Sequence, residues 1–78
     1  MPALEIGLLL FPRLTQLDLT GPHEVFAHLP GARVHLLWKD CAPVASATGL
    51  AILPTATFAE APARFDVIYV PGGPGQVI

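Results

Sequence analysis

Two short stretches of the sequence carry residues that could do chemistry. Asp18 lies in "LTQLDLTGPHEVF" (14–26), soon after the apolar run "IGLLLF", and is one of only six acidic residues. Gly72 and Gly73 follow the run "DVIYV" in the loop "PGGPG". A carboxyl group can act as a general acid or base. Glycine N–H groups can stabilise a developing negative charge, as in an oxyanion hole.

Each feature also has a structural explanation. Asp18 is expected near a helix start, where a carboxylate interacts favourably with the helix dipole and the free N–H groups. The "PGGPG" loop can equally be a turn that ends a strand, since glycine permits positive φ. Within it only Gly72, Gly73 and Gly75 have an N–H to donate. The loop matches neither a P-loop nor GxGxxG, so no nucleotide is predicted.

The other candidate residues are interpreted as structural. His23 and Glu24 fit a capping or solvent-facing role in a first helical turn, while His28 and His35 fit surface or locally bonded positions. The three histidines do not have a metal-ligand spacing, so we predict no metal and no cofactor. Cys41 follows a predicted strand in a turn and lacks the context of a nucleophile elbow, so we predict that it is not catalytic.

Composition and charge exclude several classes of protein. Of the 78 residues 53% are hydrophobic and 13% are charged, which argues against disorder and for a part of a larger domain or of an intimate oligomer. The net charge is −2 and the basic residues are scattered, so this segment is not expected to bind nucleic acid. The first apolar run is too short to span a bilayer. A single cysteine favours a reducing, cytoplasmic setting.

The hydrophobic pattern predicts a strand, a helix and a second strand in the first half of the chain. Residues 5–11 form a continuous apolar run typical of a buried parallel strand, and 32–38 read as the next strand. Between them an apolar stripe recurs every four residues, at Leu17, Gly21, Val25 and Leu29. We expect Leu17 and Leu19 to lie in the core. Pro22 either occupies the first helical position or kinks a helix that began earlier.

The second half predicts one further buried strand. Residues 43–58 are rich in Val, Thr, Ile and Ala and form either a small hairpin or an irregular excursion. Residues 65–70 are a buried-type strand that ends at "PGGPG". In an open α/β sheet, ligands bind outside the carboxyl ends of the strands. In a flavodoxin-like strand order the first and the last strand are neighbours, so Asp18 is expected to face a crevice together with Gly72 and Gly73.

The chain resembles the N-terminal part of the DJ-1/PfpI superfamily, and within it the isonitrile hydratases. The resemblance rests on "IGLLLFPRLTQLDLTGPHEVFAHLP", "VHLLWKD" and "FDVIYVPGGPG", which are in order and well spaced. Its most specific part is "DLTGPHEV" followed by "VPGG". It implies a flavodoxin-like parallel sheet sandwiched by helices, of which residues 1–78 are the N-terminal portion of a single domain.

The resemblance also implies an activity and a site. The activity is that of a hydro-lyase that adds water to a small organic isonitrile and gives an N-substituted formamide, in a homodimer. The family's nucleophile is a cysteine at a strand-to-helix elbow that lies outside this segment. Asp18 matches the acidic residue that contacts that cysteine, and we expect it to be the proton donor. Gly72 and Gly73 match the glycines that line the pocket.

Two other functions remain open at this point. One is a ligand-sensing, amidotransferase-like domain of a transcription regulator, because such domains carry similar "LDLxGPxEVF" and "PGG" stretches. The other is a different enzyme of the superfamily, such as a glyoxalase, deglycase or protease. "GPHE" and the apolar neighbours of Asp18 favour the hydratase and a small uncharged substrate.

Overall fold

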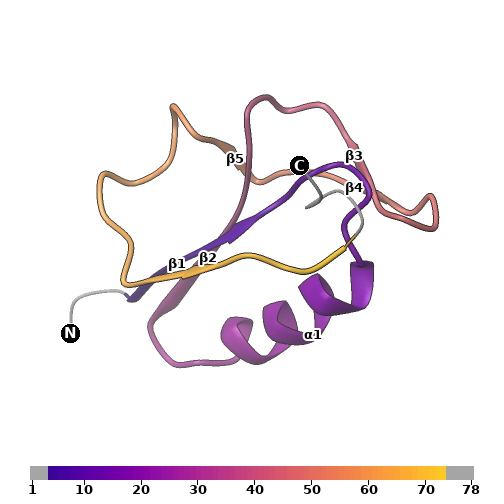
Figure 1. Cartoon of the computed structure of the whole chain (residues 1–78). Helices are drawn as coiled ribbons and strands as arrows, with labels where there is room; N and C mark the ends of the chain where they lie inside the picture. The colour runs from indigo at the N-terminus through magenta and orange to yellow at the C-terminus, as the bar shows by residue number, and fades with distance from the viewer. Residues whose placement is uncertain (1–3, 74–78) are drawn as a thin grey trace.

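A computed structural model describes residues 4–73 as one α-helix and six strands (Figure 1). The elements are β1 (Leu4–Leu9), α1 (Gln16–Ala27), β2 (Ala32–Trp38), β3 (Val44–Ala45), β4 (Ala51–Ile52), β5 (Ala56–Thr57) and β6 (Val67–Tyr69). The prediction for 32–38 is confirmed, whereas the strands predicted at 5–11 and 65–70 are shorter than expected. Segment 43–58 contains a hairpin, β3–β4, and then β5, which joins the main sheet.

The main sheet is parallel and has the strand order β5-β2-β1-β6. Leu8 of β1 lies opposite Leu36 of β2 on one side and Tyr69 of β6 on the other. The predicted adjacency of the first and last long apolar runs is therefore confirmed, and so is the flavodoxin-like α/β fold. β1 is apolar without alternation, which is the pattern of a parallel strand whose two faces are both covered.

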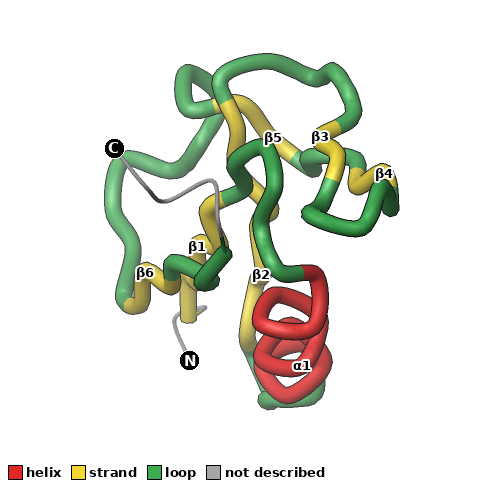
Figure 2. The backbone as a smooth tube through the Cα atoms, turned by 45° about the vertical axis from the view of Figure 1, so that its right-hand side comes forward, coloured by secondary structure: helices red, strands yellow, loops and turns green. Residues whose placement is uncertain are grey.

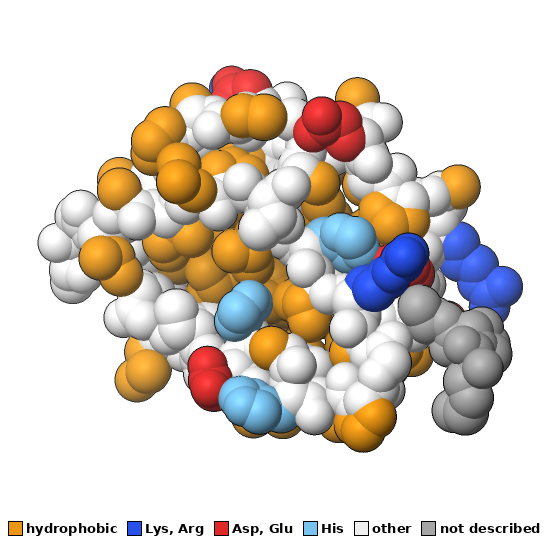
Figure 3. Space-filling view, turned by 180° about the vertical axis from the view of Figure 1, so that it is seen from behind, with side chains coloured by type: hydrophobic (Ala, Val, Ile, Leu, Met, Phe, Trp, Pro, Cys, Tyr) orange, Lys and Arg blue, Asp and Glu red, His pale blue; other side chains and the backbone are white. Residues whose placement is uncertain are grey.

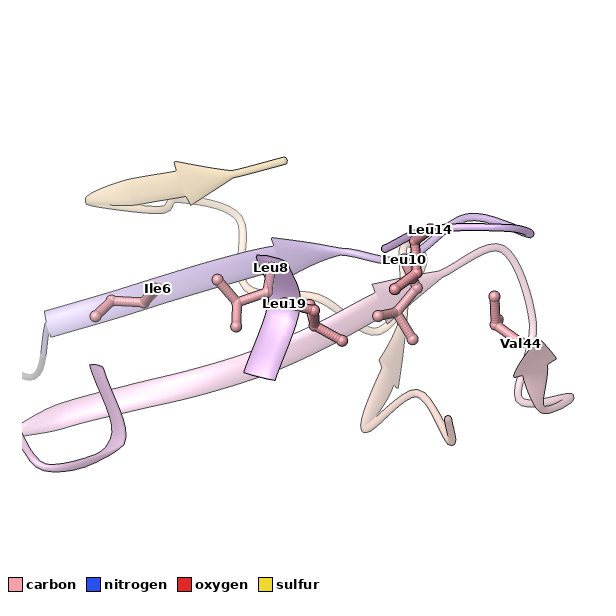
Figure 4. Close-up of a cluster of buried hydrophobic side chains, with 6 residues drawn as sticks. All are labelled: Ile6, Leu8, Leu10, Leu14, Leu19 and Val44. Atoms are coloured by element: carbon pink, nitrogen blue, oxygen red, sulfur yellow. The ribbon is translucent and has the colours of Figure 1, made fainter. Parts of the chain in front are cut away.

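Helix α1 packs on one face of this sheet (Figures 1 and 2). The hydrophobic core between the sheet and the helix is formed by residues of β1, the loop after it, α1 and the β3–β4 hairpin. Its buried members are Ile6, Leu8, Leu10, Leu14, Leu19 and Val44 (Figure 4). Phe26 on the next turns of α1 packs against this core and meets the ring of Tyr69 edge-on, with ring centroids 6.4 Å apart. The helix is thus held by Leu19 and Phe26, seven residues apart, which is the spacing of one helical face.

The apolar stripe predicted on α1 faces outward, so the expectation that Leu17 lies in the core is wrong. Leu17 is 71% exposed and Val25 is 65% exposed, whereas Leu19 is 1% exposed. Apolar residues occupy two faces of the helix, and the four-residue repeat identified the wrong one. Pro22 lies inside the helix, six residues after its first residue. Its placement at the first helical position is therefore excluded, and the helix begins earlier, after Thr15.

The opposite face of the sheet carries no helix among the described residues. Gly7 lies on this face of β1, and a Cβ there would come within 3.1 Å of side-chain carbons of Leu37, Phe65 and Ile68. Figure 3, seen from behind, shows hydrophobic side chains gathered across the middle of the molecule, with histidine and charged side chains beside them. Within residues 4–73 no helix has the length and apolar character needed to cross a membrane.

Candidate functional site

Asp18 is in the first turn of α1, three residues after Thr15. Its backbone N–H donates to the Thr15 carbonyl oxygen at 3.0 Å, which fixes this turn, and its side chain is exposed. An anion at this end of a helix is favoured by the dipole. The structural explanation for Asp18 therefore fits its position, but it does not explain what lies next to the carboxylate.

The carboxylate of Asp18 lies against Gly72. A Cβ placed on Gly72 would come within 2.9 Å of Asp18 Oδ2, and apart from the two chain neighbours no other atom of the described residues is within 4 Å of it. The Gly72 carbonyl accepts a hydrogen bond from the Thr15 N–H at 2.8 Å, so the end of β6 is joined directly to the start of α1 (Figure 1). The sheet edge thus brings Asp18 and Gly72 together, as the strand order requires. Their catalytic role stays a prediction.

Gly73 is packed against the loop that precedes α1. Its φ is +146°, and a Cβ there would lie 2.6 Å from the Thr15 nitrogen and 2.8 Å from both the Arg13 carbonyl oxygen and the Leu14 Cα. Real side chains do not approach a backbone this closely, so this position requires glycine. Pro74 and Gly75, also in the predicted loop, lie outside the described residues, and with them lies the predicted N–H of Gly75.

Asp18 differs from the other acidic residues in that its side chain has no polar partner within residues 4–73. Within residues 4–73 its carboxylate takes part in no ion pair and no side-chain hydrogen bond. The chain has six acidic residues, and the other five each bind a basic side chain or a backbone N–H: they are Glu5, Glu24, Asp40, Glu60 and Asp66. Each of these five carboxylates thus has a polar partner, whereas that of Asp18 has none among residues 4–73.

Two of the other candidate residues have exposed positions in the structure. Nδ1 of His28 lies 2.7 Å from the Glu24 carbonyl oxygen on the exposed side of α1. Cys41 is exposed in the loop between β2 and β3. Among the described residues no group of three His, Cys, Asp or Glu side chains could hold a metal ion.

A charged cluster on the open face of the sheet was missed by the sequence analysis. Glu5 on β1 binds His35 Nε2 at 2.7 Å and Arg33 at 3.1 Å, both on β2. The hydrogen bond from His35 and the charge of Arg33 hold the pKa of the Glu5 carboxyl below its ordinary value. The register of β1 and β2 places Glu5 opposite Arg33. The sequence alone does not give this register, so it did not indicate the cluster.

The sequence also did not indicate two residues next to the site, Arg13 and Ser46. Arg13 has a φ of +66° and is the one residue other than glycine with a positive φ in the part of the chain described. Ser46, in the β3–β4 hairpin, is 4% exposed although it is polar. Neither residue stands in a motif. The Arg13 N–H donates to the carbonyl oxygen of Ala45, far away in the sequence, whereas the hydrogen bonds of Ser46 are to residues of its own hairpin.

Comparisons with known proteins agree with this geometry. The sequence profile of the DJ-1/PfpI family matches residues 5–77. Isonitrile hydratase from Pseudomonas putida is 60% identical over 73 residues, which are 94% of this chain and 32% of that protein. The crystal structure of a ThiJ/PfpI family protein from Pseudomonas syringae matches with a TM-score of 0.90 and 43% identity, over 96% of this chain and 31% of that one. The chain thus spans about a third of the length of these relatives.

Proposed function

The chain belongs to the DJ-1/PfpI family, and from that premise we propose that it supplies the acid and one wall of an active site that hydrates small organic isonitriles. The observation that carries the proposal is the position of Asp18. It is the one acidic side chain without a structural partner in the described part of the chain, and it lies against Gly72 at the carboxyl edge of the sheet. The 60% identity to an isonitrile hydratase supports the same reaction.

In the proposed reaction a thiolate attacks the terminal carbon of the isonitrile, and Asp18 delivers a proton to that same carbon. The product of this step is a thioimidate, in which the carbon is bonded to sulfur and double-bonded to nitrogen. Water then adds to the carbon, and one of its protons goes to the nitrogen. Its other proton returns to Asp18 as the carbonyl forms, the carbon–sulfur bond breaks and the thiolate leaves. The sum is one isonitrile and one water giving one N-substituted formamide, with the thiolate and the protonated Asp18 restored. A positioned general acid contributes about 10²–10⁴-fold to such a step.

The glycines have two roles in the proposal. Gly72 lacks a side chain, so the Asp18 carboxyl can lie against the end of β6. The N–H groups of Gly72 and Gly73 are donors for negative charge that builds on the substrate. The nucleophile is expected to be an elbow cysteine outside residues 1–78, because Cys41 is on an exposed loop after β2.

The proposal also covers the partners, the oligomeric state and the location of the protein. The partners are a small-molecule substrate and a second copy of the protein, so the working form is a homodimer in the cytoplasm. No cofactor, nucleic acid or membrane is required. The sparse and scattered positive charge supports the absence of a nucleic-acid partner.

The proposal is tested in a chimera that carries residues 1–78 in place of the matching 73 residues of the Pseudomonas putida enzyme. Incubation with cyclohexyl isonitrile is expected to produce N-cyclohexylformamide, measured by chromatography, at a rate within about tenfold of that of the parent enzyme. Residues 1–78 alone are expected to give no product, since the nucleophile is absent.

The parent enzyme is the positive control, and a chimera with its elbow cysteine changed to serine is the negative one. A folded chimera that forms no formamide would contradict the proposal. If such a chimera still bound the isonitrile, the result would favour the sensing function.

A further inference from the structure

The loop between β1 and α1, residues 11–15, is held from two sides. On one side the Arg13 N–H donates to the Ala45 carbonyl oxygen at 2.8 Å, and the Ala47 N–H donates to the Leu14 carbonyl oxygen at 2.8 Å. Both partners belong to the β3–β4 hairpin or its turn. On the other side the Thr15 N–H donates to Gly72 at 2.8 Å. Three consecutive loop residues are therefore fixed by backbone groups of two distant segments.

The hairpin that holds the loop is itself fixed by Ser46. The Ser46 N–H donates to the Leu50 carbonyl oxygen at 2.8 Å, and the Leu50 N–H donates back to Ser46 Oγ at 3.0 Å. The Ser46 carbonyl accepts from the Gly49 N–H at 3.0 Å. Next to it Val44 is buried in the core with Leu14. A buried hydroxyl with its partners in place gives the hairpin one conformation, so it can act as a rigid support.

Arg13 keeps a conformation that its own chemistry disfavours. At a φ of +66° the Cβ of an L-residue is crowded by its own backbone, and this cost is tolerated only where surrounding contacts determine the conformation. Here those contacts are visible. The Arg13 N–H is directed at the hairpin, and the Arg13 carbonyl lies against Gly73. Strain of this kind tends to occur next to functional sites.

From this arrangement we infer that residues 11–15 position Asp18. Arg13 and Ser46 are the positioning residues, Arg13 through its backbone conformation and Ser46 by fixing the hairpin that binds the loop. The inference rests on the proposed function. Asp18 follows the loop by three residues and is bonded to it through the Thr15 carbonyl. A change of φ at Arg13 shifts the first turn of α1 relative to Gly72, and the acid then no longer meets the substrate. A misplacement of about 1 Å can cost about 10²-fold in rate.

The test compares two substitutions at Arg13 in the active chimera. Both Arg13→Gly and Arg13→Val remove the guanidinium and keep the N–H, but glycine accepts positive φ whereas a β-branched residue resists it. Arg13→Gly is expected to keep kcat within about threefold of the unsubstituted chimera. Arg13→Val is expected to lower kcat by about tenfold or more with KM within about twofold, because the acid is displaced while the rest of the pocket is kept.

Equal kcat values for the two variants would overturn the inference, and so would a loss confined to KM. If Arg13→Val does not fold, the pair Ser46→Ala and Thr48→Ala decides. Ser46→Ala removes the acceptor for the Leu50 N–H and is expected to lower kcat about threefold or more. Thr48→Ala removes only the 3.4 Å contact of Thr48 Oγ1 with Ser46 Oγ and keeps that acceptor, so its kcat is expected to be unchanged. Equal kcat in this pair overturns the inference. An unsubstituted chimera that folds without turnover would instead be a failure of the proposed function.

Discussion

Among single residues, Gly72 faces Asp18 in the first turn of α1, whereas Gly73 faces the loop that precedes this helix. A methyl group on Gly72 would meet the end of the Asp18 side chain, which can rotate away. A methyl group on Gly73 would meet the backbone nitrogen of Thr15, which cannot. Gly72 therefore leaves room for the Asp18 carboxylate, whereas Gly73 leaves room for the backbone of residues 13–15.

Gly72→Ala is expected to separate activity from stability. Because the methyl only displaces the Asp18 carboxylate, the free energy of unfolding should change by less than about 0.5 kcal/mol, while kcat of the chimera falls about tenfold to 10²-fold. Gly73→Ala combines a positive φ with a backbone clash and should cost about 1–3 kcal/mol of stability. Denaturant unfolding and formamide assays on both variants measure these effects. Full activity of Gly72→Ala would show that Asp18 need not lie against the glycine.

At the scale of elements, the pairing of β1 with β2 and β6 depends on Gly7. Its missing side chain leaves room for the Cδ1 atoms of Leu37 and Ile68, each 3.1 Å from where a Cβ would lie. Gly7→Ala is expected to destabilise the protein by about 1–3 kcal/mol through overpacking. Ile68→Val removes the Cδ1 of Ile68, one of the three side-chain carbons that a Cβ at this position would meet, the third being on Phe65.

The two changes together should therefore cost less than the sum of the single changes, with a coupling of about 0.5–3 kcal/mol. A double-mutant cycle of unfolding free energies measures this coupling. Strict additivity would contradict the packing described around Gly7.

The strand pair β1–β2 is also expected to respond to pH through Glu5. The hydrogen bond from His35 and the charge of Arg33 lower the Glu5 pKa in the folded state below the ordinary 4.5. A lowered pKa means that Glu5 contributes stability above pH 4.5, and that this contribution is lost as the pH falls through the folded-state value. The difference in Tm between the unsubstituted protein and Glu5→Gln should accordingly shrink from about pH 7 to about pH 3.

Glu24→Gln is the matched control for this measurement. Glu24 faces His28 in an exposed pair at 3.7 Å on α1, and exposed pairs contribute little to stability. Its Tm should follow that of the unsubstituted protein across the same range. A Glu5→Gln difference that is constant with pH would refute the role of the Glu5–His35 pair.

In the molecule as a whole, the sequence was sufficient for three of the four strands of the main sheet, β1, β2 and β6, and for one side of the site, but it did not predict that β5 joins this sheet. Long apolar runs predicted the strands, and parallel neighbours with one common carboxyl edge predicted that Asp18 and Gly72 meet. These inferences depend only on local pattern and on a small set of allowed topologies.

The rest depends on contacts that no local pattern encodes. Leu17 and Leu19 are the same residue type two positions apart, and only the location of the sheet decides that Leu19 is buried. The positive φ of Arg13 follows from bonds to Ala45 on the hairpin. The ion pairs of Glu5 follow from the register of β1 and β2.

The most direct test of the central claim is the rate of formamide formation by the chimera with Asp18 and with Asp18→Asn. We predict that Asp18→Asn folds with a Tm only a few degrees lower, since the carboxylate has no side-chain partner among residues 4–73 and its interaction with the helix dipole contributes only about 0.3–1 kcal/mol. We also predict a kcat lower by about 10²-fold or more, because the amide cannot deliver the proton. Equal kcat values for the two proteins would contradict the account.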